Sequence, residues 1–119
     1  MPAAIVTGAN GGVGTAVCRS LEDRGYRVLG VDRMETYGAA DGEFAFDLRD
    51  LSEAPERTEP ALAKIEASLE GELNLLVNNA AVQITKPIEA MTLDDWMETL
   101  RVNLLAPAAC VPSIHPGFF

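Results

Sequence analysis

The chain has 119 residues, of which 48% are hydrophobic and 23% are charged, and this length and composition fit a single globular domain. Its formal net charge of −9, with nine scattered lysines and arginines, argues against nucleic acid or an anionic membrane surface as a partner. No apolar run approaches the roughly 18 residues that span a membrane, and no segment has the order of a signal peptide, so we expect a cytoplasmic protein. Cys18 and Cys110 have no metal-binding spacing, and we expect no metal site.

The N-terminal segment combines a strand, a glycine-rich turn and a helix. Residues 3–7 are a short apolar run typical of a buried strand, and Val13, Val17 and Leu21 share one face of a helix predicted over 13–24. Glycines let the intervening backbone approach phosphate groups closely, and the start of the helix supplies unpaired N–H groups and the positive end of its dipole. The turn therefore predicts a binding site for the pyrophosphate of a dinucleotide, formed by Gly8, Asn10, Gly12, Val13 and Gly14.

A second strand is predicted over 26–31, and Asp32 follows it, eighteen residues after Gly14. Dinucleotide-binding folds place an acid about 20 residues after the glycines, at the end of the second strand, where it accepts hydrogen bonds from a ribose. Arg33 comes next and could hold a 2′-phosphate, but Asp32 would repel that phosphate. We therefore expect both residues at the cofactor, and we favour NAD over NADP.

The remaining pattern continues the alternation of strands and helices. It predicts a loop over 33–42, a strand over 43–46, a helix over 60–70, a strand over 73–78 and a helix over 93–106. This alternation is typical of an α/β fold, here a partial doubly wound, Rossmann-type parallel sheet with strand order 3-2-1-4. A ligand in such a fold lies at the carboxyl ends of the strands, in the crevice between strands 1 and 4.

The last predicted helix has a clear start and an apolar stripe. Thr92 is placed to cap its N-terminus, with Asp95 three residues later. Pro107 is expected to kink or end the helix. We therefore divide the chain into an NAD-binding Rossmann half-domain over 1–106 and an irregular C-terminal tail over 107–119. The stripe consists of Leu93, Met97, Leu100 and Leu104.

These segments together resemble the short-chain dehydrogenase/reductase family over nearly all of residues 3–106. The glycine turn has that family's spacing, Thr-Gly-x-x-x-Gly-x-Gly. The segment Asn78-Asn79-Ala80-Ala81 is similar to the family's Asn-Asn-Ala-Gly, with Ala81 in place of the last glycine. Asp47-Leu48 is similar to the family's acidic–apolar pair after the third strand, and Asn103 is similar to its helix asparagine.

The resemblance implies the cofactor-binding half of an oxidoreductase that moves hydride between a nicotinamide and a carbonyl or alcohol. The family's asparagine holds a water for an active-site lysine that this sequence lacks, so Asn103 is catalytic by descent only. No Tyr-x-x-x-Lys occurs in the chain, and we expect these residues to be inactive alone, with the substrate unassigned. The further residues implied are Asp47 and Leu48 at the adenine, and Asn79, Ala80 and Ala81 along the rest of the cofactor.

Simpler roles stay open for several of these residues. Asp47 could cap a turn, the two asparagines after the fourth strand could satisfy backbone groups, and Asn103 could bond to backbone. The alternative function is a non-catalytic module that binds NAD or a protein partner. We also expect a homo-oligomer or self-association, because strand 73–78 has an apolar edge and the family uses the helix corresponding to 93–106 as a subunit interface.

Overall fold

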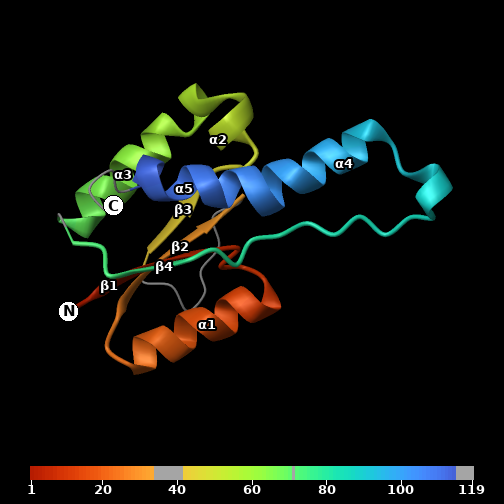
Figure 1. The fold of residues 1–119 in the computed structure, drawn as a ribbon. Coiled ribbons are helices and arrows are strands. Elements are labelled where there is room, and N and C mark those ends of the chain that lie inside the picture. The colour runs from red at the N-terminus through yellow and green to blue at the C-terminus, as the bar shows by residue number, and fades with distance from the viewer. Residues whose placement is uncertain (34–41, 71, 115–119) are drawn as a thin grey trace.

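The computed structural model describes residues 1–33, 42–70 and 72–114, in which four strands form one parallel sheet (Figure 1). The strand order is β3-β2-β1-β4, as the sequence predicts. The central strand β1 pairs with β2 on one side and β4 on the other, so that Ile5 stands opposite Leu29 and Leu76. The carboxyl ends of all the strands therefore lie along one edge of the sheet. The strands are β1 (Ala3–Thr7), β2 (Arg27–Asp32), β3 (Gly42–Ala45) and β4 (Leu75–Val77).

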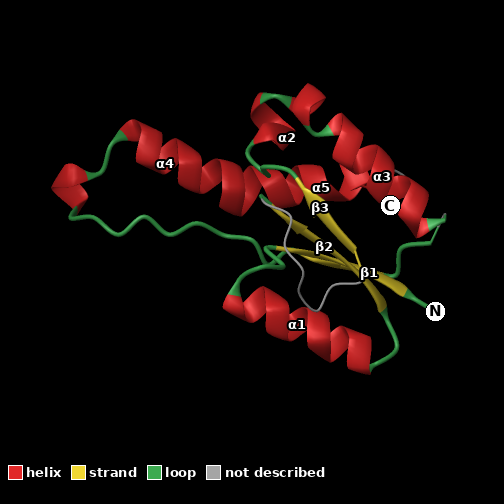
Figure 2. Ribbon diagram, turned by 180° about the vertical axis from the view of Figure 1, so that it is seen from behind, coloured by secondary structure: helices red, strands yellow, loops and turns green. Residues whose placement is uncertain are grey.

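Helices cover both faces of the sheet (Figure 2). Side chains alternate along a strand, so Ile5 joins the core beside Ile65 of α3 and Cys110 of α5, whereas Val6 packs with Cys18 of α1. One face carries α1 (Gly12–Asp23), and the other carries α2 (Asp50–Glu53), α3 (Glu59–Leu69) and α5 (Ala106–Ile114). Within the described ranges, no helix combines the length and the apolarity needed to cross a membrane.

The helix predicted over 60–70 is confirmed as α3. Its predicted apolar face contacts the core, where Ile65 and Leu69 are buried and Leu62 packs against them. The sequence did not predict α2 or the 3₁₀ turn at Pro55–Arg57, because three or four residues are too few to show a helical period. Most of the loop predicted over 33–42 lies outside the described residues, and Gly42 already belongs to β3.

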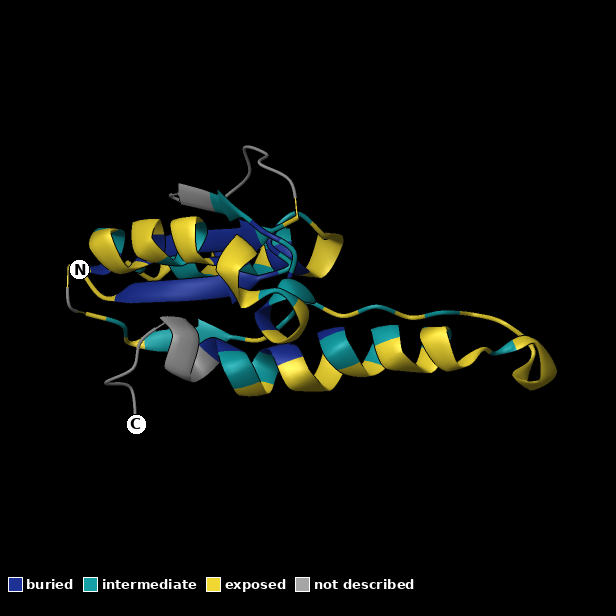
Figure 3. Ribbon diagram, turned by 90° about the horizontal axis from the view of Figure 1, so that it is seen from above, coloured by how far each residue is buried: buried dark blue, intermediate teal, exposed yellow. Residues whose placement is uncertain are grey.

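The segment that leaves β4 and the helix α4 (Leu93–Leu100) project together beyond the sheet, with a 3₁₀ turn at Ile88–Ala90 at their tip (Figures 1 and 3). Thr92 caps α4 as predicted. Its hydroxyl accepts the N–H of Asp95 at 3.1 Å, and the Asp95 carboxylate accepts the N–H of Thr92 at 3.0 Å. The predicted apolar stripe is open to solvent, since Leu93 of α4 is 77% exposed and Leu104, in the turn that follows α4, is 60% exposed.

The prediction of an irregular tail is wrong for the described residues after 106. A π-helical turn at Arg101–Leu105 joins α4 to α5, and α5 continues to Ile114. Pro107 does not end the helix, because the wider turn just before it replaces the α-helical turn whose carbonyl the proline ring would meet. The buried side chains of Ala106 and Cys110 anchor α5 to the core. Residues 115–119 lie outside the described part of the chain.

Candidate functional site

A cavity of about 380 Å³ opens at the carboxyl ends of the strands. Its walls come from the turn after β1, from the residues that follow β2, β3 and β4, and from α4 with the π-helical turn. Asn10 and Asn103, two of the predicted residues, do not line it. The predicted residues that do are Gly8, Gly12, Val13, Gly14, Asp32, Arg33, Asp47, Leu48, Asn79, Ala80 and Ala81. Residues not predicted as contacts complete the lining: Gly11, Phe46, Arg49, Val82, Glu98 and Val102.

The three glycines of the turn serve different purposes. Gly8 has a left-handed backbone with φ +67°, and a Cβ there would lie 2.9 Å from the Cα of Ala80. A Cβ on Gly14 would lie 2.0 Å from the carbonyl oxygen of Gly8, so the contact between turn and helix requires glycine. A Cβ on Gly12 would meet no described protein atom within 4 Å. Packing therefore explains Gly8 and Gly14, whereas Gly12 leaves open space on the cavity wall.

The start of α1 meets the cavity without a side-chain cap. Gly11 is the N-cap residue and Gly12 is the first helical residue, and because glycine has no side chain, the N-cap residue itself supplies no side-chain cap. The first N–H groups of a helix have no acceptor within the helix, and its dipole is positive there, so this end favours an anion. Val13 is 69% exposed and lines the cavity, whereas Val17 and Leu21, predicted to share its helix face, pack against the core.

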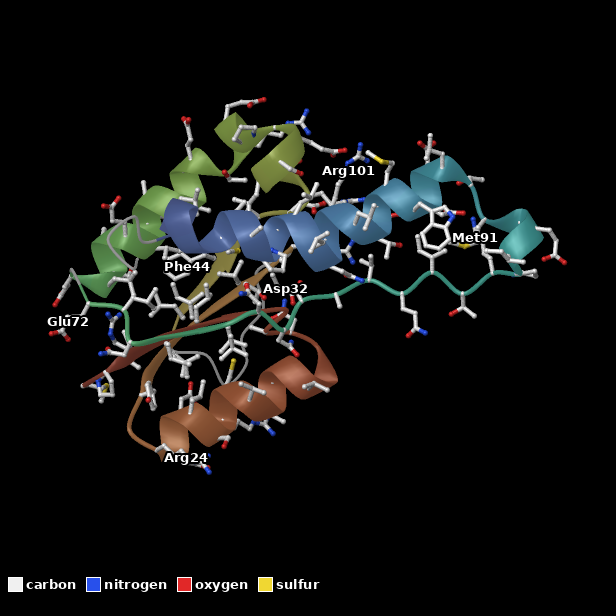
Figure 4. All side chains as sticks on the ribbon, viewed as in Figure 1. Arg24, Asp32, Phe44, Glu72, Met91 and Arg101 are labelled. Carbon is white, nitrogen blue, oxygen red and sulfur yellow. The ribbon has the colours of Figure 1, made fainter. Side chains whose placement is uncertain are left out.

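Asp32, labelled in Figure 4, lies at the carboxyl end of β2. Its Oδ2 accepts the N–H of Asn10 at 3.0 Å, and its Oδ1 accepts the N–H of Arg33 at 2.8 Å. Asn10 thus orients the carboxylate although it does not itself line the cavity. Because each carboxylate oxygen has two lone pairs, Asp32 can accept further hydrogen bonds from a ligand.

Thr7 and Asn79 tie the glycine turn to the end of β4. The hydroxyl oxygen of Thr7 accepts the N–H groups of Asn79 and Ala80, each at 3.1 Å. The side-chain amide of Asn79 donates to the carbonyls of Thr7 at 3.1 Å and Gly8 at 3.2 Å. Asn79 therefore fills the simpler role of satisfying backbone groups. Thr7 holds the end of β4 against the turn, and only its position directly before the glycine turn could have indicated this.

Asp47 forms a close ion pair with Arg49, which also contacts Glu98 of α4. The Nη2 of Arg49 lies 2.6 Å from Oδ2 of Asp47, and its Nη1 lies 2.8 Å from Oε1 of Glu98. The hydrogen bonds from Arg49 hold the pKa of Asp47 below its usual value, against the opposing effect of burial. Sequence analysis missed Arg49 and Glu98, because a pair 49 residues apart leaves no local pattern.

Asn103 holds the segment after β4 against the helix. Its Oδ1 accepts the N–H of Val82 at 2.8 Å, and its Nδ2 donates to the carbonyl of Val82 at 2.9 Å. Both polar atoms of the side chain are therefore engaged with backbone, which matches the simpler role that the sequence left open. Within the described residues, no three His, Cys, Asp or Glu side chains gather to hold a metal ion.

Comparisons with known proteins match this arrangement. The family model for short chain dehydrogenase matches residues 2–118. An acetoacetyl-CoA reductase from Acinetobacter sp. (strain RA3849) is 32% identical over an alignment of 113 positions, and the match covers 85% of this chain and 44% of that protein. NADPH-bound carbonyl reductase from chicken fatty liver has a TM-score of 0.80 at 25% identity, with 96% of this chain and 50% of that chain covered.

A second solved structure is an oxidoreductase of the short chain dehydrogenase/reductase family from Brucella ovis, in complex with a partially ordered NAD. Its TM-score is 0.79 at 25% identity, with 95% of this chain and 56% of that chain covered. The chain thus spans about half the length of the relatives it matches. One of these two structures holds NADPH and the other holds NAD, so the likeness alone does not distinguish the cofactors.

Proposed function

The chain belongs to the short-chain dehydrogenase family, and from this premise we propose that it is the cofactor-binding part of an NAD-dependent oxidoreductase of carbonyl or alcohol substrates. One observation carries the proposal. The start of α1, whose N-cap residue is a glycine, lines the same cavity as Asp32. A Cβ on Gly12 would meet no described protein atom within 4 Å, so a ligand has space to approach this end of the helix. These are the features that a dinucleotide requires of a fold of this type.

The residues present fit a dinucleotide. Gly12, Val13 and Gly14 would hold its pyrophosphate through their backbone N–H groups, and Asp32 would accept hydrogen bonds from the adenosine ribose. Asp47 and Leu48 would hold the adenine, and the stretch from Asn79 to Ala81 would border the path to the nicotinamide. The cofactor, when bound, supplies the hydride chemistry. The chain binds it and fixes its orientation.

We propose a preference for NAD over NADP on the charge of Asp32. Two like charges about 4 Å apart repel by roughly 4 kcal/mol at an effective dielectric constant of about 20, and solvent reduces this at an open site. The remainder corresponds to a preference of about ten- to hundredfold. Arg33 also lines the cavity and opposes this effect, since its charge attracts a 2′-phosphate.

The test is calorimetric titration of the chain with NAD and with NADP, repeated on Asp32→Asn. We expect NAD to bind more tightly to the wild-type chain, and the substitution to bring the two affinities to within about threefold, because it removes the repelling charge. Equal affinities in the wild-type chain, or tighter binding of NADP, would contradict the role of Asp32. Absence of binding by either dinucleotide would contradict the proposed function.

We further propose that the 119-residue chain does not transfer hydride by itself. Four residues after Tyr26 and Tyr37 stand Gly30 and Asp41, so neither tyrosine begins a Tyr-x-x-x-Lys motif. Asn103 does not replace the tyrosine of that motif, because a carboxamide is not a proton donor, and both of its polar atoms are engaged with Val82. These observations also favour the second candidate, a non-catalytic module that binds NAD or a protein partner.

Self-association completes the proposal. The helical stretch 93–106 exposes Leu93, Trp96, Met97, Leu100, Leu104 and Leu105. β4 stands at the end of the strand order, so one side of it pairs with no other described strand. An apolar helical face and an unpaired strand edge both favour association with a second chain. We propose a homo-oligomer formed through these elements.

A further inference from the structure

Arg49 makes two separate contacts at the cavity wall. Its guanidinium binds the carboxylate of Asp47 in a forked, bidentate arrangement. Nε lies 3.1 Å from both carboxylate oxygens, and Nη2 lies 2.6 Å from Oδ2. Its Nη1 lies 2.8 Å from Oε1 of Glu98. All three side chains line the cavity and are 34%, 25% and 37% exposed for Arg49, Asp47 and Glu98. Arg49 thus joins the residue that follows β3 to helix α4.

These contacts nearly fill the acceptor capacity of Asp47. An ionised carboxylate has about four lone-pair positions. Arg49 directs three N–H donors at it: Nη2, the backbone N–H, which lies 3.0 Å from Oδ1, and Nε, whose single N–H is shared between the two oxygens. Three donors on about four acceptor positions leave about one position for a ligand, which a ligand would take from the shared Nε–H. An amino group on a purine ring can use that position, whereas a ring carbonyl cannot.

Neighbouring charges keep this acceptor ionised. The hydrogen bonds of Arg49 lower the pKa of Asp47, and the positive charge of Arg33 adds to the effect while burial opposes it. Asp47 in turn raises the pKa of Arg49, with smaller contributions from Glu98 and Glu53. The pair therefore stays charged on both sides at neutral pH, and the guanidinium fixes where the carboxylate oxygens point.

We propose that Arg49 is a positioning residue for the purine end of the dinucleotide, holding Asp47 so that its remaining acceptor position receives the amino group of adenine. Through Glu98, the same guanidinium ties α4 to this wall of the cavity. The inference rests on the proposed function, because it assigns a residue of the same site. The selectivity for adenine would then depend on Arg49, which acts on the base only through Asp47.

The experiment measures two ligands by titration calorimetry on the whole chain. One is NAD, and the other is nicotinamide hypoxanthine dinucleotide, in which a ring carbonyl replaces the amino group of adenine. Arg49→Gln removes the guanidinium, and Glu98→Gln removes the charge of its second partner while keeping an acceptor oxygen. Arg101→Gln is the matched control, because Arg101 Nε lies 2.7 Å from Oε1 of Glu53 and neither residue of this pair lines the cavity (Figure 4).

We expect the wild-type chain to bind NAD about tenfold more tightly than the hypoxanthine dinucleotide, the loss that one unmade hydrogen bond to a charged group produces. Arg49→Gln should weaken the binding of NAD by about tenfold and reduce the preference for NAD over the hypoxanthine dinucleotide to about twofold or less. Glu98→Gln should weaken NAD by less, and Arg101→Gln should change neither quantity. In an Asp47→Asn background, Arg49→Gln should cause no further loss, because both changes act through one carboxylate.

The outcomes separate the two proposals. If the wild-type chain binds NAD but Arg49→Gln keeps its preference for adenine, the positioning role is wrong and the proposed function stands. The same holds if Arg101→Gln weakens binding as much as Arg49→Gln. If the wild-type chain does not bind NAD, both proposals are wrong. Should Arg49→Gln melt without a cooperative transition, Arg49→Lys takes its place, because it keeps the charge but cannot form the fork.

Discussion

Two alanine substitutions, two residues apart, should separate what the fold requires from what a ligand requires. A Cβ on Gly14 would lie 2.0 Å from the carbonyl oxygen of Gly8 and 2.8 Å from its carbonyl carbon. Both atoms are backbone, so the turn or the helix would have to move. A Cβ on Gly12 would meet no described protein atom within 4 Å, and its backbone is not left-handed.

The two substitutions should have different effects on the melting temperature. Overpacking of this kind costs about 3 kcal/mol or more, out of a total stability of about 5–15 kcal/mol. For a chain of this length, about 3–5 °C of Tm corresponds to 1 kcal/mol, so Gly14→Ala should melt at least about 10 °C lower. Gly12→Ala should melt at the wild-type temperature or slightly higher, because alanine restricts the unfolded chain by about 0.4–1 kcal/mol.

Binding should show the opposite order of effects. The methyl group of Gly12→Ala occupies the space through which a pyrophosphate approaches the start of α1, so NAD affinity should fall about ten- to hundredfold in a protein that remains folded. Circular dichroism melts and calorimetric titration with NAD check the two predictions. The reasoning is refuted if Gly12→Ala binds NAD like the wild-type chain, or if Gly14→Ala melts like it.

Three further predictions concern activity, association and pH. The purified chain should not oxidise NADH with a panel of small ketones, since loss of a proton donor alone costs about 10²–10⁴-fold, and turnover that Asn103→Ala abolishes would contradict this. Light scattering should show a mass that rises with concentration and that falls to the monomer value in Leu93→Lys/Leu104→Lys; a concentration-independent monomer would contradict self-association. Burial raises the pKa of Cys110 from 9.0 to about 11. As the pH rises, the unfolded chain therefore loses this proton before the folded chain does. Chemical denaturation should show the free energy of unfolding falling by up to about 2–3 kcal/mol between pH 9 and 11. Cys110→Ala should not show this fall. Equal slopes in both proteins would contradict it.

The sheet and most of its helices follow from local patterns in the sequence. Uninterrupted apolar runs mark the buried strands, and the capping pair Thr92–Asp95 marks the start of α4. The tail was mispredicted because a single rule, that proline ends a helix, ignored the wider π-helical turn that accommodates Pro107. Tertiary packing of Cys110 then keeps the helix ordered.

The lining residues of the cavity could be predicted where a sequence motif fixes the backbone. They could not be predicted where two contacting residues are far apart in the sequence. The glycine turn and Asp32 carry their spacing in the sequence, and both line the cavity. Arg49 and Glu98 meet only after folding, so neither position alone indicates their contact. Likewise, the sequence alone does not reveal that Gly14 meets the fold's requirement while Gly12 leaves space for a ligand.

The most direct test of the account is a titration of the ¹⁵N-labelled chain with NAD, followed by amide chemical shifts. The account predicts saturable shifts for Gly12, Val13, Gly14 and Asp32 at the cavity, with little change along α3 (Glu59–Leu69), which does not line it. No saturable change, or changes centred on α3, would contradict the claim that this cavity binds a dinucleotide.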